Sequence, residues 1–440
     1  MKVGIVGAGV TGLTAAYQLG KQGHQVTVYE TEAIAGGLSS GFHVPEWKWT
    51  LDRFYRHVFA GDRAIIALAK ELEVPLTFTR PVTSLWVNGH PYPYDSPIAA
   101  ALYPNLPFHL NIRVGMVIAY LKYIVRHGTY LEHTTADAWL RRTMGERAYR
   151  ELWEPMLRGK FKDHFDQVNM AWFWARVYKR TPRLGTFVGG FQAFFDALAD
   201  RIRAQGGVIL LNTPVQGIAP VEGGGLRLTT PEGQFTYDAV AATVGPGLMA
   251  RLAPDLPPGY LGQLLKLKSM GAIALILALE RQLMERTYWL NLPARSPDQR
   301  ENEFPFMALV EHTNYIPAEH YGGEHLVYCG DYISPDHRYF EMSQEELLAT
   351  FLPSLKKVNP AFEASWVRRS WLFRARYAQP VPPVNHSGSI PAQRTPIRGL
   401  YYASMSQVYP WDRGTNYAAE MGRQVAEMVH KDVGRRTEDE

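Results

Sequence analysis

The first thirty residues constrain the fold more than any other part of the chain. An apolar run at 3–6 favours a buried parallel strand, and residues 13–19 place apolar side chains at helical spacing before Gly23. A second strand is predicted at 25–30 and ends on an acidic residue. Strand, helix and strand within thirty residues form a β-α-β unit, which is typical of a doubly wound parallel sheet.

The glycines of this unit match a dinucleotide-binding turn. Gly7 permits the tight turn, Gly9 lets the backbone approach a pyrophosphate, and Gly12 lets helix and strand pack closely. The free amides of the helix N-terminus favour phosphates, and Glu30 is placed to accept both ribose hydroxyls. A purely structural glycine turn is the alternative, but the acid at the required spacing disfavours it. The contacts predicted here are Gly7, Gly9, Val10, Thr11, Gly12 and Glu30.

Composition excludes several classes of function. The net charge of +4, from 46 basic and 42 acidic residues, demands no nucleic-acid partner. The single cysteine, Cys329, forms no intramolecular disulfide, and no Cys/His cluster predicts a metal site. We therefore expect a cytoplasmic protein with no metal.

The apolar stretch 114–125 is too short to span a bilayer. Its bulky side chains fall on one helical face, which favours packing in the core. Attachment to a membrane surface is the alternative, supported by Arg113, Lys122 and Arg126 nearby. A peripheral membrane contact therefore remains open, without a transmembrane span.

A second glycine pair follows Glu30, and here the chain resembles the flavin amine oxidase superfamily, which includes protoporphyrinogen oxidases, monoamine oxidases and phytoene desaturases. The resemblance implies non-covalent FAD rather than NAD, with contacts from Gly36, Gly37, Leu38 and Ser39. Residues 51–59, Leu-Asp-Arg-Phe-Tyr-Arg-His-Val-Phe, also look like the corresponding part of UDP-galactopyranose mutases.

Later segments extend the resemblance. It implies that Val215 contacts adenine through its backbone and that the strand ending at Thr243 returns to the cofactor. It also implies that the last helix points its N-terminus at the flavin, with contacts from Gly414, Asn416 and Tyr417. One departure is that residues 403–405 are Ala-Ser-Met where the family usually has an FAD-binding acid.

These observations predict an α/β fold with a Rossmann-type (GR2-like) FAD-binding domain and an interleaved mixed α+β substrate domain. The FAD-binding domain is expected at 1–80, 184–256 and 375–440, and the substrate domain at 81–183 and 257–374. The first substrate segment is expected to be largely helical. The second is expected to contribute strands at 273–279 and 324–329 to a sheet facing the flavin.

Two residues are candidates for catalytic roles. His57 resembles the mutase histidine beside the flavin and could move protons, although a hydrogen-bonded core role is the commoner one for such a histidine. Arg413, just before the last helix, could hold an anionic substrate group or pair with an acid. The amine-oxidase lysine behind the flavin has no counterpart in 273–280, where the matching residue is aliphatic.

The resemblance implies an FAD-dependent oxidoreductase that removes hydride from a C–H or C–N centre of a largely apolar small molecule. The first alternative is a non-redox mutase or isomerase acting on a sugar nucleotide, for which Arg176, Tyr178, Arg180 and Arg183 could line the pocket. The second is an FAD-binding protein with a structural role only. The sequence does not specify an oligomeric state.

Overall fold

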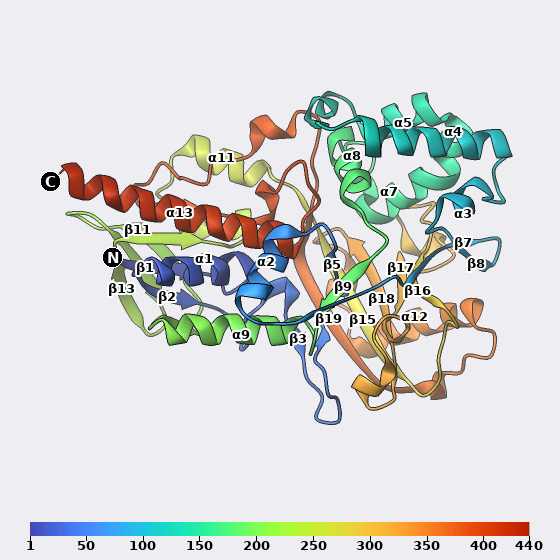
Figure 1. Ribbon diagram of the computed structural model, residues 1–440, viewed down its shortest axis with the longest axis horizontal. Coiled ribbons are helices and arrows are strands. Elements are labelled where there is room, and N and C mark those ends of the chain that lie inside the picture. The colour runs from blue at the N-terminus through green and yellow to red at the C-terminus, as the bar shows by residue number, and fades with distance from the viewer. Residues whose placement is uncertain (440) are drawn as a thin grey trace.

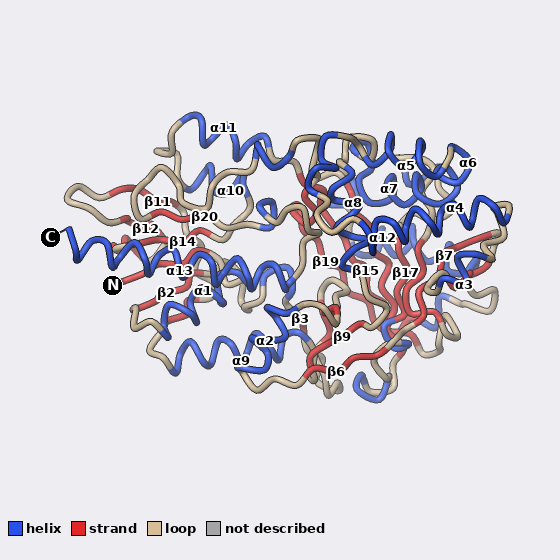
Figure 2. Tube along the Cα trace, turned by 45° about the horizontal axis from the view of Figure 1, so that its top comes forward, coloured by secondary structure: helices blue, strands red, loops and turns tan. Residues whose placement is uncertain are grey.

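The fold is built on two large sheets, and the computed structural model describes residues 1–439. The first sheet is parallel, with the strand order β10–β2–β1–β14–β20. Figure 2 shows its strands and those of the second sheet grouped toward opposite ends of the molecule. The strands of the first sheet are β1 (Lys2–Val6), β2 (Gln25–Tyr29), β10 (Val208–Leu210), β14 (Ala239–Ala242) and β20 (Leu400–Tyr402).

Both faces of the parallel sheet are covered, as expected for near-continuously apolar strands. Val3 and Ile5 of β1 pack against helices on one face, whereas Val6 packs with the other layer. The first layer contains α1 (Val10–Lys21), α2 (Arg63–Glu71), α9 (Phe191–Ala204) and α13 (Thr415–Asp439). The second contains β11 (Gly217–Pro220), β12 (Leu226–Thr230), β13 (Gly233–Tyr237), α10 (Pro246–Leu252) and α11 (Pro258–Lys266).

The second sheet is mixed and has the order β19–β15–β18–β17–β16–β7–β8. Strand β15 is buried at every residue except its first, because apolar side chains cover both faces of the sheet. Helix α12 (Gln344–Val358) covers one face. The strands are β19 (Val367–Pro380), β15 (Ser269–Leu279), β18 (His325–Ile333), β17 (Ala308–Glu311), β16 (Thr287–Asn291), β7 (Val82–Val87) and β8 (His90–Pro93).

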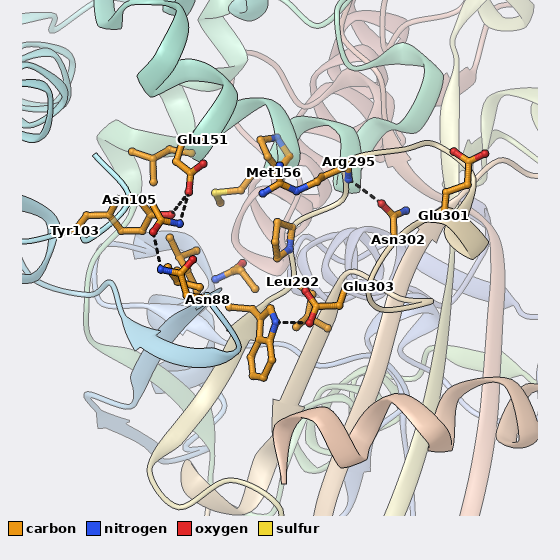
Figure 3. Close-up of a pocket in the computed structure, with 17 residues that line it drawn as sticks. Asn88, Tyr103, Asn105, Glu151, Met156, Leu292, Arg295, Glu301, Asn302 and Glu303 are labelled. Carbon is orange, nitrogen blue, oxygen red and sulfur yellow. Dashed lines mark hydrogen bonds between the residues drawn. The ribbon is translucent and has the colours of Figure 1, made fainter. Parts of the chain in front are cut away.

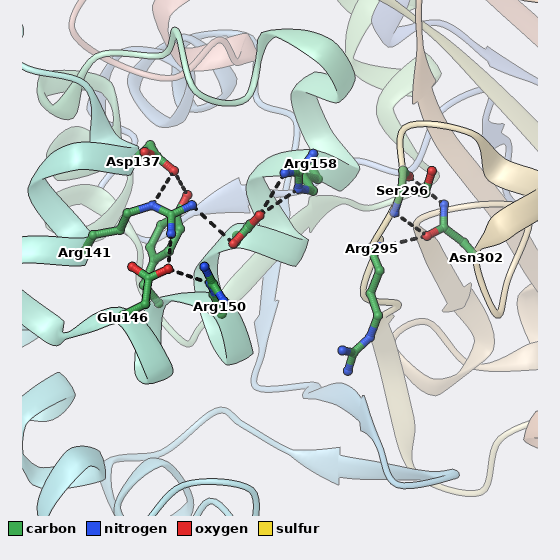
Figure 4. Close-up of polar contacts among 10 residues, drawn as sticks. Asp137, Arg141, Glu146, Arg150, Arg158, Arg295, Ser296 and Asn302 are labelled. Carbon is green, nitrogen blue, oxygen red and sulfur yellow. Dashed lines mark hydrogen bonds and ion pairs between the residues drawn. The ribbon is translucent and has the colours of Figure 1, made fainter.

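A helical layer lies beside this sheet (Figure 1). Its members are α3 (Pro97–Ala101), α4 (Phe108–Ala119), α5 (Ala136–Met144), α6 (Glu146–Ala148), α7 (Glu154–Phe161) and α8 (Met170–Lys179). Arg141 ties three of them together by pairing with Asp137, Glu146 and Glu154 (Figure 4). A guanidinium shared among three carboxylates fixes the relative positions of α5, α6 and α7.

Two features differ from the sequence expectations. Segment 81–183 is not purely helical, because β7 and β8 join the mixed sheet, where β7 runs parallel to β16. Stretch 114–125 is α4 followed by a π-helical turn, Tyr120–Ile124, and only part of its apolar face is in the core. Leu121 is fully buried, whereas the side chain of Ile124 is 68% exposed.

A small sheet forms where the chain passes between the two large sheets. Strand β9 (Leu184–Phe187) pairs with β5 (Val58–Phe59) and β6 (Leu76–Thr79). In the chain segment that precedes β5, β3 (Gly41–Phe42) pairs with β4 (Leu51–Asp52). These short pairings hold residues 53–57 between the parallel sheet and the mixed sheet. Within residues 1–439, no helix combines the length and the apolar character that a membrane crossing requires.

Candidate functional site

The glycine turn between β1 and α1 has the geometry of a phosphate-binding loop. A Cβ atom on Gly12 would lie 2.0 Å from the carbonyl oxygen of Gly7, so α1 can approach β1 only because residue 12 is glycine. A Cβ on Gly9 would meet no atom within 4 Å, which leaves open space in front of the turn. No described side chain caps α1, and its first turn has no acidic residue, so its amides remain available for an anion.

The Glu30 carboxylate lies directly across from this turn. Its Oε2 accepts a hydrogen bond from the Ala8 amide at 2.8 Å, and its Oε1 accepts one from the Glu32 amide at 3.0 Å. These bonds fix the carboxylate at the end of β2 and leave further lone pairs on both oxygens. The carboxylate can therefore accept hydrogen bonds from a diol held at the turn.

The second glycine pair is attached to the same loop. The Gly36 amide donates to the Ala8 carbonyl at 2.8 Å, and Gly37 approaches Gly9 so closely that an added Cβ would lie 3.2 Å from the Gly9 Cα. Leu38 and Ser39 follow in a short 3-10 turn, Gly37–Ser39. On the other side, Thr243 donates its hydroxyl to the carbonyls of Val6 and Gly7. These predicted residues therefore surround one turn.

The remaining predicted cofactor residues lie in two other places. Val215 is partly buried in the loop before β11. Gly414 precedes α13, and Asn416 in its first turn accepts hydrogen bonds from the Ala64 and Ile65 amides, so its side chain caps α2. Tyr417 stacks on Trp411 with ring centroids 6.1 Å apart.

These residues fit FAD at the adenosine and pyrophosphate end. The open space at Gly9, the uncapped α1 and the Glu30 acceptors supply what a ribose and a pyrophosphate need. Where the family acid is missing, Ser404 is buried, and its hydroxyl accepts a hydrogen bond from Tyr402. That position offers a hydroxyl group instead of a carboxylate.

His57, one of the two candidates for a catalytic role, lies in a partly buried position near several arginines. It lies just before β5, and burial together with Arg180, Arg176 and Arg56 lowers the pKa of His57 to about 3. The lowered pKa favours the neutral imidazole at pH 7, and the proton-moving role suggested for His57 stays a prediction. Its Nδ1 is buried and has no hydrogen-bond partner among the described residues.

Arg413 belongs to a group of basic side chains drawn from four segments, which we call the cation cluster. Its members are Arg56 before β5, Lys160 in α7, Arg176 and Arg180 at the end of α8, and Arg413 before α13. Each lies close enough to another member to shift its pKa or that of a shared neighbour. Sequence reasoning grouped Arg176 with Arg180 and suggested Arg413 separately, but it did not bring the two sets together or include Arg56 and Lys160.

Asp412 is the carboxylate at the centre of the cation cluster. It pairs with Arg176 at 2.6 Å and with Lys160 at 3.5 Å, and it accepts a hydrogen bond from Trp172. Lys160 and the neighbouring arginines hold the pKa of Asp412 below its usual range despite its burial. Arg413 instead donates to the Tyr332 hydroxyl, and its Nε has no partner among the described residues.

Sequence reasoning missed the buried lysines of α7 and the turn after it. Lys162 pairs with Asp331 of β18 at 2.9 Å, and both side chains are almost fully buried. Lys160 is also buried, which lowers its pKa well below the usual value. The available signal was the spacing of the two lysines around Phe161, at the end of a helix.

A separate cavity of about 130 Å³ lies near the N-terminal end of α7 (Figure 3). Asn105 and Tyr103 donate hydrogen bonds to Glu151 there, and Trp86 donates to Glu303. Its lining residues come from β7, β16, α7 and the loops around them, and none is a predicted cofactor residue. Lys160 lies at the other end of α7, so this cavity is distinct from the cation cluster.

Comparisons with known proteins agree with the cofactor geometry. Residues 10–430 match the family of flavin containing amine oxidoreductases. AofH of Mycobacterium tuberculosis, assigned as a flavin-containing monoamine oxidase, is 28% identical over 285 residues, which cover 58% of this chain and 60% of AofH. The match therefore spans less than two thirds of that relative.

Solved structures share the fold over nearly the whole chain. A protein from Exiguobacterium sp. 255-15, assigned as a protoporphyrinogen oxidase, has a TM-score of 0.76 at 18% identity, covering 98% of this chain and 99% of that one. A reduced UDP-galactopyranose mutase has a TM-score of 0.74 at 17% identity, covering 97% of this chain and 95% of that one. At these identities the likeness establishes the fold.

Proposed function

This chain belongs to the family of flavin containing amine oxidoreductases, and we propose that it is an FAD-dependent oxidoreductase acting on a small molecule with a large apolar part. The bound flavin would accept a hydride from a C–H or C–N centre of that substrate. The observation that carries the proposal is the turn between β1 and α1, with open space at Gly9 and the Glu30 carboxylate opposite.

The roles proposed for the chain's own residues are binding and orientation. The amides of the α1 N-terminus would hold the pyrophosphate, and Glu30 would accept the ribose hydroxyls. The positive end of the α13 dipole would favour negative charge at the facing end of the flavin. Neutral His57 would orient a neighbouring group through hydrogen bonds rather than carry a proton.

The division of labour follows the predicted domains. Segments 1–80, 184–256 and 375–440 would hold FAD, and segments 81–183 and 257–374 would hold the substrate. In support, the parallel sheet draws all its strands from the first set, and the mixed sheet draws most of its residues from the second.

The test is anaerobic photoreduction of the purified protein, followed by mixing with air-saturated buffer while the visible spectrum is recorded. We expect a yellow protein whose oxidised spectrum returns rapidly if oxygen is the acceptor, and slowly if another acceptor serves. A colourless protein that takes up no added FAD would overturn the proposal.

A non-redox mutase acting on a sugar nucleotide is the second candidate. It is favoured by one observation: two arginines suggested for such a substrate, Arg176 and Arg180, belong to the cation cluster and lie near His57. Tyr178 instead contacts Trp174 and Trp411, and Arg183 is exposed. Incubating the reduced protein with a UDP-hexose and analysing the sugar separates the two candidates, because the mutase isomerises the sugar without net oxidation.

We also propose that the protein works in the cytoplasm. The lone thiol, Cys329, lies fully buried in β18, and burial raises its pKa. A chain without a disulfide is suited to a reducing compartment.

A further inference from the structure

We propose that the cation cluster binds a multiply charged oxyanion of the substrate, such as a diphosphate or a dicarboxylate. This inference rests on the proposed function and adds to it a second substrate feature. The apolar body would be oriented by an anionic end. The site is partly open to water, because Lys160 is buried whereas Arg180 is exposed.

The cluster carries more positive charge than its surroundings neutralise. Arg176, Arg180 and Arg413 lie near Asp412, together with Lys160, whose pKa burial lowers, and Arg56 lies near Arg413. Asp412 already pairs with Lys160 and Arg176. Asp331 is engaged by Lys162 outside the cluster. The carboxyl group of Asp52 lies near Arg56, but burial raises its pKa to about 7, so it supplies only part of a charge at neutral pH.

Two members also retain unused hydrogen-bonding capacity. The Arg413 Nε is buried without a partner in the described residues, although its Nη2 donates to Tyr332. Arg180 keeps an exposed side chain beside Arg176. Guanidinium groups bind carboxylate and phosphate oxygens through two parallel N–H donors, so an oxyanion would use the donors that the protein leaves free.

Four of the five cluster members come from elements other than the predicted pyrophosphate turn. FAD phosphates belong at the turn between β1 and α1, whereas these four lie at the ends of α7 and α8 and in the segment before α13. The fifth, Arg56, donates its Nε to the carbonyl of Leu38, a predicted cofactor contact, at 2.9 Å. The cofactor's own phosphates therefore do not account for the excess charge.

The test uses the FAD-loaded protein and two probes, inorganic pyrophosphate and succinate, with acetate as the singly charged control. We expect titration calorimetry to detect binding of pyrophosphate or succinate. Acetate should bind at least tenfold more weakly than the preferred probe. Arg176→Gln and Arg413→Gln should each raise the dissociation constant of the preferred probe about tenfold. Arg176→Lys should restore part of the loss.

Arg281→Gln is the matched control. Arg281 is exposed in the loop between β15 and β16 and contacts no member of the cation cluster. Flavin content and melting temperature are measured for every variant. No binding by the FAD-loaded protein, or equal dissociation constants for wild type and both Gln variants, would overturn the anion site. Failure to take up FAD would instead overturn the proposed function, so the two failures are distinguishable.

A different observation carries a second inference: we infer that the segment 98–130 docks onto an anionic lipid surface. Nine of the fourteen large hydrophobic side chains that are exposed in the described structure fall within this segment. They are Ile98, Leu102, Phe108, Ile112, Met116, Tyr120, Tyr123, Ile124 and Tyr130, which we call the apolar face.

The spacing of these residues shows a continuous stripe. Phe108, Ile112, Met116 and Tyr120 recur every four residues along α4 and into the π-helical turn. The opposite side of the same helix packs in the core through Val114 and Leu121. The helix is therefore apolar on both sides, although one side faces solvent. Figure 1 places α4 at the end of the molecule opposite the N-terminus.

Charge identifies the occupant as lipid. Residues 97–131 contain no Asp or Glu but include Arg113, Lys122 and Arg126. Positive charge beside exposed aliphatic and tyrosine side chains suits the headgroup region of an anionic membrane. The Lys122 Nζ also donates to the Arg180 carbonyl at 2.7 Å, so the apolar face adjoins the cation cluster. An amphiphilic anion could pass from one to the other.

Flotation with vesicles of phosphatidylcholine and phosphatidylglycerol in equal parts tests this inference. We expect the wild type to float with these vesicles and to remain largely unbound with phosphatidylcholine alone. The triple variant Met116→Ser, Tyr123→Ser, Ile124→Ser should lose most of the bound fraction while keeping its FAD. Leu265→Ser, on α11 and 67% exposed, is the matched control. Unchanged flotation of the triple variant, or a lipid-free dimer that this variant dissociates, would overturn the inference.

Discussion

Glu311 in β17 is a carboxyl group that folding removes completely from water. It accepts hydrogen bonds from the Leu283 and Met284 amides, and His325 Nδ1 lies 3.9 Å from its Oε1. Burial raises the pKa of Glu311 to about 8, whereas an exposed glutamate has a pKa of about 4.3. The folded chain therefore keeps this proton at pH values where the unfolded chain has lost it.

We expect Glu311→Gln to reduce the pH dependence of stability. Because the folded pKa is raised, the stabilisation is complete below the unfolded pKa and is lost as pH rises toward about 8. Across this window, wild type should lose up to about 1.4 kcal/mol of unfolding free energy per pH unit relative to the variant. Urea denaturation of both proteins across the window measures their unfolding free energies. Taking the difference between wild type and variant at each pH cancels the effects of other buried groups such as Asp52. Parallel pH profiles would contradict the assignment.

Gly9 and Gly12 allow packing and cofactor binding to be separated. Gly12→Ala should destabilise the FAD-free protein by roughly 1–3 kcal/mol, because its Cβ would collide with the Gly7 carbonyl. Gly9→Ala should leave the FAD-free melting temperature unchanged and weaken FAD binding, because its Cβ fills the open space at the turn. Thermal unfolding and FAD titration check both. A Gly9→Ala protein with wild-type FAD affinity would contradict the pyrophosphate assignment.

At the scale of elements, the helices and strands whose signals lie close together in the sequence could be predicted from it. The β1–α1–β2 unit is local, and its periodicity and glycines were sufficient to predict it. Strands β7 and β8 form a local hairpin around Asn88 and Gly89, a signal that the prediction overlooked. The pairing of β7 with β16, about two hundred residues later in the sequence, has no such local signal. The cation cluster was predicted only in part: Arg176 and Arg180 lie in one segment and were grouped, whereas the other members join them only after folding. The exposure of Ile124 likewise depends on where α4 lies, not on its periodicity.

The junction of α13 and α2 provides a prediction at this scale. Asn416→Ala should destabilise the protein by about 1–2 kcal/mol, because the part-buried Ala64 amide and the buried Ile65 amide lose their shared acceptor. Hydrogen exchange should accelerate in the first turn of α2 before it changes in β1. Asn416→Asp, which keeps an acceptor oxygen, is the control. Equal exchange in all three proteins would show that solvent satisfies these amides.

At the scale of the whole molecule, the chain passes repeatedly between the two large sheets, so we expect them to unfold together. FAD at about one hundred times its dissociation constant should then add about 2.7 kcal/mol to a single unfolding transition. Calorimetry with and without FAD tests this, with the Gly9→Ala protein as the control that gains less. Two transitions, of which only one responds to FAD, would show that the sheets unfold independently.

The packing of α13 on α1 has a consequence for synthesis. Gly422 lies so close to α1 that an added Cβ would be 2.5 Å from the Thr11 carbonyl oxygen. Translation proceeds at roughly 5–20 residues per second, so about 400 further residues take roughly 20–80 s to emerge. Throughout that interval the nascent chain presents the α1 surface without its partner. Protection by ribosome-associated chaperones would therefore matter for α1, which is synthesised about 400 residues before its packing partner α13.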